Sequence, residues 1–444
     1  MSSETPVTNT AGLGLPPLPS GWQVKRLRFI ATVQTGMAKG KDLAGEDTVE
    51  VPYLRVANVQ DGYLDLTDVA TMPVPVRDLD RYRLQPGDVL MNEGGDFDKL
   101  GRGHVWHGQI EPCIHQNHVF AVRPHGVSPE WLNAYTGSAP AQFYFMGRAK
   151  QSTNLASISS SNLMELPVVV PTDDERDALL AFLDSETARI GALIEKKLRF
   201  IELLHEKRQR LVTQIVTTGI RSGTLLKESG VCWFKQIPAH WCVKRLRHVT
   251  QSVKAGPFGS SLTKEVYVSS GTRVYGQEQV ISGDFALGDY YIDDSLAGEL
   301  SQYRVRPGDV LISCVGTFGK IAVVPISAEP GVINPRLIRL RLNSLVDPCY
   351  LAEILRSSIV FEQFQLWSRG GTLDVINVGT LNSIFLPIPP PEEQISLLEQ
   401  IRVRSAKLDA LVYQTERSIE LLRERRAALI TAAVTGQIDL HEAT

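Results

Sequence analysis

Long apolar runs, paired cysteines and an excess of basic residues are all lacking in this 444-residue sequence. No run reaches the roughly 18 apolar residues of a membrane-spanning helix, and the first residues lack the apolar stretch of a secretory signal, so we expect neither feature. The five cysteines are scattered, odd in number and without a Cys-x-x-Cys pair. This pattern excludes a disulfide framework and favours reduced thiols in the cytoplasm.

The formal net charge of -3 excludes an overall basic protein, although a local basic stripe suffices for contacts with phosphates. Recognisable catalytic motifs are also lacking, since there is no Gly-x-Ser-x-Gly elbow and no His-Glu-x-x-His pair. The stretch 316–320 resembles a phosphate loop, but Cys314 replaces the earlier glycine and Ile321 replaces the Ser or Thr. We therefore exclude a Walker site and predict no catalytic residue.

What the sequence does contain is a second copy of itself. Six residues of 22–28 return in 241–247, seven of 82–90 return in 303–311, and all four of 201–204 return in 419–422. The offsets are 219, 221 and 218, so one long folding unit is duplicated in tandem. A duplicated unit tends to fold with a pseudo-two-fold axis, which suits a target with two halves such as duplex DNA.

Each half combines a globular stretch with a long helix. Strand-like runs occur at 51–59, 118–123 and 337–342, and short helices are expected near 129–136 and 348–357. We predict an α+β chain in which two tandem, pseudo-two-fold-related α/β domains are joined by two long antiparallel coiled-coil helices. The predicted boundaries are a flexible tail 1–19, a globular unit 20–171, a helix 172–220, a linker 221–237, a second unit 238–391, a second helix 392–436 and a tail 437–444.

Both long helices carry a seam with alternating spacings of four and three residues, which keeps one stripe facing a partner helix. The alternative is an amphipathic helix that lies on a globular core. Arg208 and Arg426 interrupt the seam, and they either fix its register or extend to solvent. The seam positions are Ile190, Ile194, Lys197, Ile201, Leu204, Arg208, Leu211 and Ile215, followed 218 residues later by Leu408, Val412, Thr415, Ile419, Leu422, Arg426, Leu429 and Ala433.

The globular units differ from each other in polar, glycine-rich loops. Arg reads guanine, Asn or Gln reads adenine, Glu accepts from cytosine, and Lys, Ser and Thr hold phosphates, so these loops are candidate DNA contacts. In the first unit the candidates are Asn92, Glu93, Gly94, Gly95, Lys99, Arg102, His115, Gln116, Asn117, Lys150, Ser152 and Asn154. In the second they are Lys254, Phe258, Ser260, Ser261, Tyr275, Gln277, Glu278, Thr317, Lys320, Asn334, Arg336, Arg369 and Thr372.

The same loops of the first unit hold four histidines and Cys113 between residues 104 and 118. These side chains could ligate zinc, but the second copy lacks them at the aligned places. We therefore favour polar groups on a ligand-facing loop and predict no metal site.

The two copies share a scaffold but differ in these loops. Such a pair would read the two unlike halves of a DNA target.

These features together resemble the specificity subunit of Type I restriction–modification enzymes. The resemblance rests on the tandem Trp-x-Val-Lys-Arg-Leu entry, the Pro-Gly-Asp-Val-Leu turn and the Gly-Lys-Ile-Ala-Val-Val run at 319–324. It also rests on the Leu-Pro-x-Pro-Pro-Pro-Glu-Glu-Gln lead-in at 386–394 and the helix end at 429–438. The likeness covers nearly the whole chain from residue 20, with a mild departure at 171–176 in the first lead-in.

The resemblance implies two target recognition domains, each reading one half of a split, asymmetric site in double-stranded DNA, and two helical spacers that set the gap. It implies a non-catalytic subunit that binds two methyltransferase subunits and, through them, restriction subunits. S-adenosylmethionine, ATP and Mg would be bound by those partners, with no cofactor in this chain and no membrane contact. The alternatives are a coiled-coil scaffold that does not bind DNA, and a stand-alone DNA-modifying enzyme with an unrecognised active site.

Overall fold

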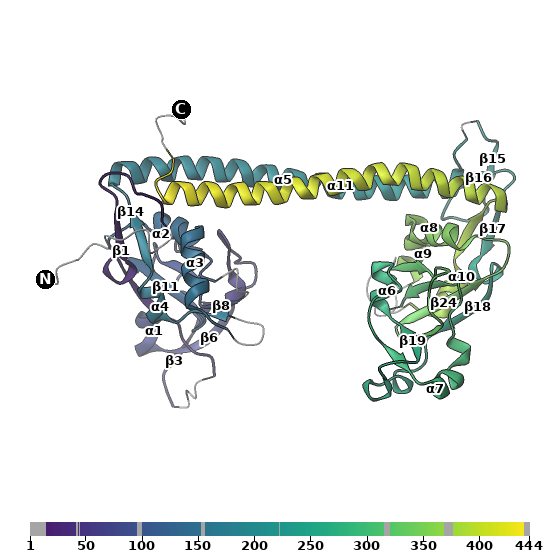
Figure 1. Cartoon of the computed structure of the whole chain (residues 1–444), viewed down its shortest axis with the longest axis horizontal. Coiled ribbons are helices and arrows are strands. Elements are labelled where there is room, and N and C mark those ends of the chain that lie inside the picture. The colour runs from purple at the N-terminus through teal and green to yellow at the C-terminus, as the bar shows by residue number, and fades with distance from the viewer. Residues whose placement is uncertain are drawn as a thin grey trace. The chain divides into compact units, whose positions relative to one another are not determined.

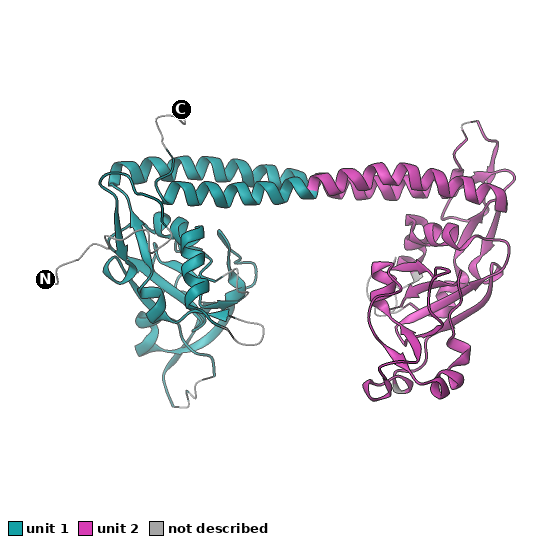
Figure 2. Ribbon diagram, in the orientation of Figure 1, with its two compact units in different colours: residues 1–197, 416–444 teal, residues 198–415 magenta. Residues whose placement is uncertain are grey.

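A computed structural model of the chain describes residues 15–40, 43, 45–95, 100–151, 156–221, 223–314, 320–367 and 376–438. The chain forms two compact units, of which unit 1 comprises Met1–Lys197 and Glu416–Thr444 and unit 2 comprises Leu198–Thr415 (Figure 2). Two long helices, α5 (Asp173–Thr218) and α11 (Pro391–Val434), are labelled in Figure 1, and each is divided between the units (Figure 2). We call their paired parts the stem and the remainder of each unit its head.

The head of unit 1 is built around a four-stranded antiparallel sheet in the order β2-β11-β7-β9. A second sheet, β10-β3-β6, contains the parallel pair β10 and β3. The entry strand β1 (Gln23–Arg26) pairs with β14 (Pro167–Val170), which leads directly into α5. The sheet strands are β2 (Ala31–Thr35), β11 (Val119–Pro124), β7 (Val89–Asn92), β9 (Gly103–Val105), β10 (Ile114–His115), β3 (Thr48–Leu54) and β6 (Ala70–Pro75).

The head of unit 2 repeats the topology of these two sheets and of the entry pair. Its four-stranded sheet has the order β18-β24-β21-β22, its second sheet contains the parallel pair β19 and β23, and its entry strand pairs with the strand before α11. The strands are β18 (Thr250–Ala255), β24 (Leu337–Leu342), β21 (Val310–Ser313), β22 (Ile321–Val323), β20 (Tyr291–Ile292), β19 (Thr272–Tyr275), β23 (Gly331–Ile333), β17 (Cys242–Arg245) and β25 (Phe385–Ile388).

Short helices cover these sheets. The two that the sequence predicts are present, as α2 (Pro129–Thr136) and α8 (Pro348–Arg356), and each has a proline in its first turn after a Ser128 or Asp347 cap. The others include α3 (Ala139–Arg148), α4 (Ser160–Met164), α6 (Gln277–Ser282), α7 (Asp294–Glu299), α9 (Ser358–Trp367) and α10 (Val378–Ser383). Mixed helix and strand in each head confirm the predicted fold class.

The stem helices pack against each other within each unit and run in opposite directions. In unit 1 the start of α5 joins the end of α11 in one core, through Leu179 and Ala433. In unit 2 the end of α5 joins the start of α11, through Ile215 and Leu397. All predicted seam positions are buried or half-buried, which confirms the seam.

The tandem repeat extends to individual hydrogen bonds between head and stem. Trp22 donates its indole N–H to Glu175 at 2.9 Å in unit 1, and Trp241 donates to Glu393 at 2.9 Å in unit 2. The hydroxyl of Thr431 accepts from Ala139 N at 3.0 Å, and that of Thr213 accepts from Ser358 N at 3.2 Å. Each head is therefore seated on its stem by the same contacts.

One expectation about the N-terminal segment needs correction. Residues 1–19 were expected to form a flexible tail, but Leu15 is buried and Leu18 packs against the same core of unit 1. Two leucines among prolines provide enough apolar surface to dock the segment 15–19. Residues 1–14 lie outside the described part of the chain.

Candidate nucleic-acid interface

A buried carboxylate fixes the central strand of each head. Asp88 caps its own turn by accepting from Gln85 N at 2.8 Å, and it also receives two hydrogen bonds from Arg123 across the sheet. The Asp88 hydrogen bonds raise the pKa of the Arg123 guanidinium, so the arginine stays protonated. In unit 2, Asp309 and Arg341 make the same pair at 2.8 and 2.6 Å. The loops with candidate contacts follow at the other end of this strand.

In unit 1 those loops meet at the end of β7. Glu93 follows β7 directly and receives a hydrogen bond from His118 Nδ1 at 2.8 Å, while Asn117 Nδ2 lies 3.4 Å from His118 Nε2. The neighbouring Gln116 is half-buried, and Lys150 is exposed on β12 (Lys150–Gln151). Strand β13 (Ala156–Ser157) pairs with both β12 and β8 (Gly94–Gly95), which brings Lys150 to the same edge. We call Glu93, Gln116, Asn117, His118 and Lys150 the unit 1 loop cluster.

In unit 2 the corresponding edge carries a different set of side chains. Gln277 donates to Ser313 Oγ at 2.7 Å, and Arg336 Nη1 lies 3.4 Å from Gln277 Oε1. Asn334 orders this loop because its Oδ1 accepts from Arg336 N at 2.9 Å. Lys320 is exposed, and its backbone carbonyl accepts a hydrogen bond from Ser313 N at 3.0 Å. We call Gln277, Lys320, Asn334 and Arg336 the unit 2 loop cluster.

The two clusters occupy the same backbone frame. In unit 1, Glu93 N donates to His118 O at 2.9 Å, and in unit 2, Cys314 N donates to Arg336 O at 2.9 Å. Ile158 N then donates to Glu93 O as Ile376 N donates to Cys314 O, at 2.9 and 3.0 Å. The frame therefore places Glu93 where the second unit has Cys314. It also places His118 where the second unit has Arg336.

Three residues predicted as DNA contacts are instead buried inside the heads. Asn92 is 1% exposed and donates to Val59 O at 2.9 Å. His115 is fully buried and donates through Nδ1 to Val119 O at 2.7 Å, and burial lowers its pKa to about 4, so the ring is neutral. Tyr275 is fully buried and donates to Glu329 O at 2.7 Å. These side chains cannot reach a ligand on the surface, so we remove them from the set.

Other predicted residues lie apart from the clusters. Arg102 is half-buried in a hollow between the head and the stem of unit 1. Lys254 is half-buried and directs its ammonium to Gln302 Oε1 at 3.2 Å. Phe258 is 86% exposed and Ser261 is half-buried in the loop after β18. Glu278 accepts from Gln279 at 3.0 Å beside Gln277.

Several predicted positions cannot be placed. Lys99, Ser152, Asn154, Thr317, Arg369 and Thr372 lie outside the described residues, as does the side chain of Ser260. His118 was not among the predicted contacts, yet the structure puts it at the centre of the unit 1 loop cluster. Aligning the two halves would have found it, because His118 precedes Arg336 by the same 218 residues as the seam positions.

Within the described part of the chain, no group of three His, Cys, Asp or Glu side chains could hold a metal ion. His104 and His107 stack edge to face with 6.0 Å between ring centroids, and Cys113 is buried, which raises the pKa of its thiol to about 12. None of the helices described here has an apolar stretch long enough to cross a bilayer.

No family model matches the chain. The StySPI type I restriction enzyme specificity subunit of Salmonella potsdam is 27% identical over 443 residues, covering 95% of this chain and 90% of that protein. The EcoKI specificity subunit of Escherichia coli K12 is 21% identical over 442 residues, with 95% and 90% covered. The provisionally named MjaX specificity subunit of Methanocaldococcus jannaschii is 22% identical over 429 residues, with 95% and 94% covered.

The curated relatives of this chain are type I restriction enzyme specificity subunits. A solved structure concerned with complex assembly and conformational transition of the type I R-M system contains a chain with the same fold. Its TM-score is 0.66 at 16% identity, with 95% of this chain and 100% of that chain covered. The likeness to specificity subunits therefore extends along the length of the chain, through both heads and both stem helices.

Proposed function

We propose that this chain is the DNA-reading specificity subunit of a Type I restriction–modification complex, with each loop cluster reading one half of a bipartite, asymmetric site. The observation that carries the proposal is the common backbone frame with unlike side chains, in which Glu93 and His118 stand where the second head has Cys314 and Arg336. A shared frame presents both clusters in the same way. Different side chains then select different bases.

The chemistry of each cluster suits base edges and phosphates. A glutamate accepts from cytosine, amide side chains pair with adenine, and an arginine pairs with guanine through two hydrogen bonds. In unit 1, Glu93 is already oriented by His118, and in unit 2, Arg336 is oriented by Gln277. Lys150 and Lys320 are exposed beside them and are suited to phosphates.

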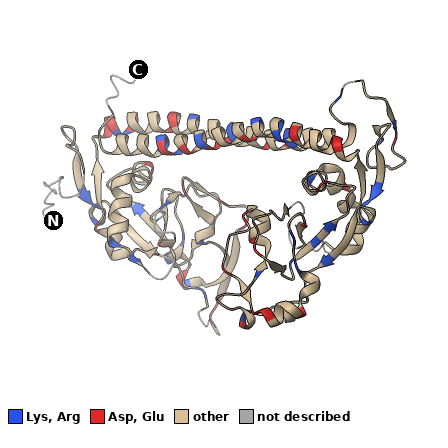
Figure 3. Cartoon of the chain, turned by 45° about the vertical axis from the view of Figure 1, so that its right-hand side comes forward, with Lys and Arg blue, Asp and Glu red and all other residues tan. Residues whose placement is uncertain are grey.

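We further propose that the stem docks two methyltransferase subunits, which carry the S-adenosylmethionine, and through them the restriction subunits with ATP and Mg. Basic and acidic residues alternate along both stem helices (Figure 3), as in the exposed pair of Arg417 with Glu420 at 2.8 Å. In unit 2 the stem also exposes Phe200, Leu203 and Tyr413 to solvent. Exposed aromatic and aliphatic side chains within a charged surface are typical of a protein-binding face.

Expressing the chain with its methyltransferase and mapping methylated adenines tests the reading of DNA. Glu93→Gln should relax one half-site and Arg336→Gln the other, each at about 1–3 kcal/mol for the base concerned. Glu299→Gln, at an exposed position on α7, is the matched control and should leave both half-sites intact. If Glu93→Gln and Arg336→Gln alter the same half-site, the assignment of one cluster to each half is wrong.

A gel shift with the methyltransferase present, repeated over a salt series, separates this function from that of a scaffold. Phosphate contacts require that log affinity fall steeply with log salt. A flat salt response would favour a coiled-coil scaffold that does not bind DNA. Methyl transfer or cleavage by the purified chain alone would instead favour a stand-alone enzyme.

A further inference from the structure

The two arginines on the stem seam have different surroundings, although they occupy equivalent places 218 residues apart. In unit 2, Arg208 of α5 meets Asp409 of α11, with 3.4 Å between Nε and Oδ1. In unit 1 the equivalent arginine is Arg426, and the residue equivalent to Asp409 is Gly191. The duplication has therefore kept the cation in unit 1 without its carboxylate.

Arg426 has no substitute partner among the described residues. Its Nε is buried without a hydrogen bond, as is that of Arg208. Unlike Arg208, it has no ion pair to a carboxylate within the described ranges. Gly191 leaves open space opposite, since a Cβ there would meet no heavy atom within 4 Å. A buried guanidinium nitrogen without a partner is costly, and this cost marks the position as a site for an anion.

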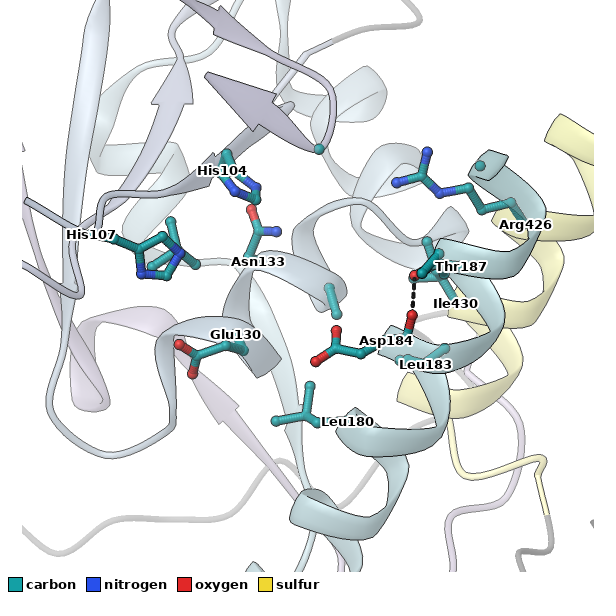
Figure 4. A pocket seen from close by; sticks show the side chains of 15 residues that line it. His104, His107, Glu130, Asn133, Leu180, Leu183, Asp184, Thr187, Arg426 and Ile430 are labelled. Carbon is teal, nitrogen blue, oxygen red and sulfur yellow. Dashed lines mark hydrogen bonds between the residues drawn. The ribbon is translucent and has the colours of Figure 1, made fainter. Parts of the chain in front are cut away.

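A hollow between the head and the stem of unit 1 opens at this place. The hollow has two adjoining arms, and Arg426 lines both. The first arm has a volume of about 470 Å³ and is also lined by Arg102 and Arg423. Asp61 is the only carboxylate in the lining of this first arm. The arm shown in Figure 4 has a volume of about 600 Å³. Arg426 lies on one side of this second arm, and Glu130 lies across it on the other. Glu130 is thus separated from Arg426 across the hollow.

The turn of the head nearest to Arg426 is shaped to approach it. Gly62 has a φ of +78°, and a Cβ at this position would lie 2.9 Å from Arg426 Nη2. Any other residue would both strain the turn and displace the guanidinium. The absence of a side chain therefore keeps the Nη2 face of Arg426 open to the hollow.

We propose that this arm of the hollow binds a phosphate-class oxyanion, held by Arg102, Arg423 and Arg426 in place of the missing aspartate. Guanidinium groups present paired N–H donors whose planar geometry matches phosphate oxygens. One oxyanion would supply the negative charge that Asp409 supplies in unit 2. The site is independent of the proposed reading of DNA, since it does not involve either loop cluster.

The chain itself provides the variant that tests the site. Gly191→Asp installs in unit 1 the carboxylate that Arg208 has in unit 2, and the open space at Gly191 accommodates it. We expect 20 mM inorganic phosphate, compared with chloride at equal ionic strength, to raise the Tm of the full-length wild-type chain by about 2–4 °C. The Gly191→Asp variant should start from a higher Tm and lose most of this increase, because its own carboxylate occupies the arginines.

Two further variants complete the test. Arg426→Gln should also lose the phosphate response, whereas Arg208→Gln, the same change in unit 2, should retain it. Because Gly191→Asp is not expected to impair folding, the test stands even if Arg426→Gln does not fold. An equal phosphate response in wild type and in Gly191→Asp, or none in either, would overturn the proposal.

A binding measurement with duplex DNA identifies the source of the phosphate group. If the DNA backbone supplies it, Gly191→Asp should weaken binding of duplex DNA about tenfold. The slope of log affinity against log salt concentration should then become shallower by about one, which corresponds to one released counterion. If free phosphate supplies it, DNA affinity should be unchanged while the thermal response to phosphate is still lost. Both results support the anion site, and they assign it to different ligands.

Discussion

Arg123 makes two hydrogen bonds, of 2.7 and 2.8 Å, to the fully buried carboxylate of Asp88. This pair joins β11 to the turn before β7, and Asp88 also accepts from Gln85 N in that turn. The loop cluster of unit 1 begins at the far end of the same four-residue strand. The position of the cluster therefore depends on a buried ion pair that does not itself contact a ligand.

Asp88→Ala should lower the free energy of unfolding of unit 1 by about 2–3 kcal/mol, because it leaves Gln85 N and the Arg123 guanidinium without their acceptor. Differential scanning calorimetry would show the transition of unit 1 moving to lower temperature, with that of unit 2 unchanged. Asp80→Ala, on the exposed face of α1 (Leu79–Tyr82), is the control and should have little effect. Equal effects of the two changes would contradict the structural role.

Arg208→Leu should stabilise unit 2 by about 1 kcal/mol. The ion pair with Asp409 is partly exposed and contributes little, whereas the buried Nε of Arg208 lacks a hydrogen bond on a seam that otherwise favours leucine. Urea denaturation would show a higher midpoint with an unchanged m-value. The control is Arg210→Leu, at an exposed stem position where no gain is expected. A loss of stability in Arg208→Leu would instead show that the ion pair between Arg208 and Asp409 is stabilising overall.

The buried His115 should make unit 1 sensitive to acid. Its folded pKa of about 4 lies below the unfolded value of about 6.5, so the unfolded chain binds more protons between these values. The contribution to stability is complete above pH 6.5 and is lost as the pH falls toward 4, by at most about 3 kcal/mol. His115→Gln can still donate to Val119 O and should flatten this dependence in denaturant titrations. His125→Gln, at an exposed position, should leave it unchanged.

The stem should set the gap between the two half-sites that the proposed function requires. Extending the Arg208–Asp409 pairing along the stem places residues 201–207 opposite residues 410–416. Deleting both segments removes one heptad from each seam and shortens the stem by about 10 Å, or about three base pairs. Methylation mapping should then find both half-sites unaltered with a shorter gap. An unchanged gap would argue against the stem as a spacer.

The helices were predictable because their signals are periodic and long. Leu204, Ile215 and Ile419 recur at the spacing of a seam, and the structure buries all three. The prolines at the starts of α2 and α8 likewise indicated those short helices. The internal repeat doubled each of these signals, since a pattern found in one half could be checked in the other.

The candidate site was less predictable because its strands are covered on both faces. All four residues of β7 are buried, so the alternation that would have shown Asn92 to point inward is absent. Tyr275 ends β19, where three consecutive residues are buried. Which side of a loop Arg102 faces depends on the stem packed beside it, which comes from residues more than 300 positions later in the chain. Local sequence carries no information on that contact.

The division of the stem has a consequence for biosynthesis. Unit 2 is continuous in sequence, whereas the core of unit 1 includes Ala433 and Val434 from α11. A ribosome therefore makes the whole of the second unit before it delivers the residues that close the first. During that interval the apolar surface around Leu179 and Leu183 has no covering helix, so a chaperone or an early-bound partner would have its best opportunity to act there.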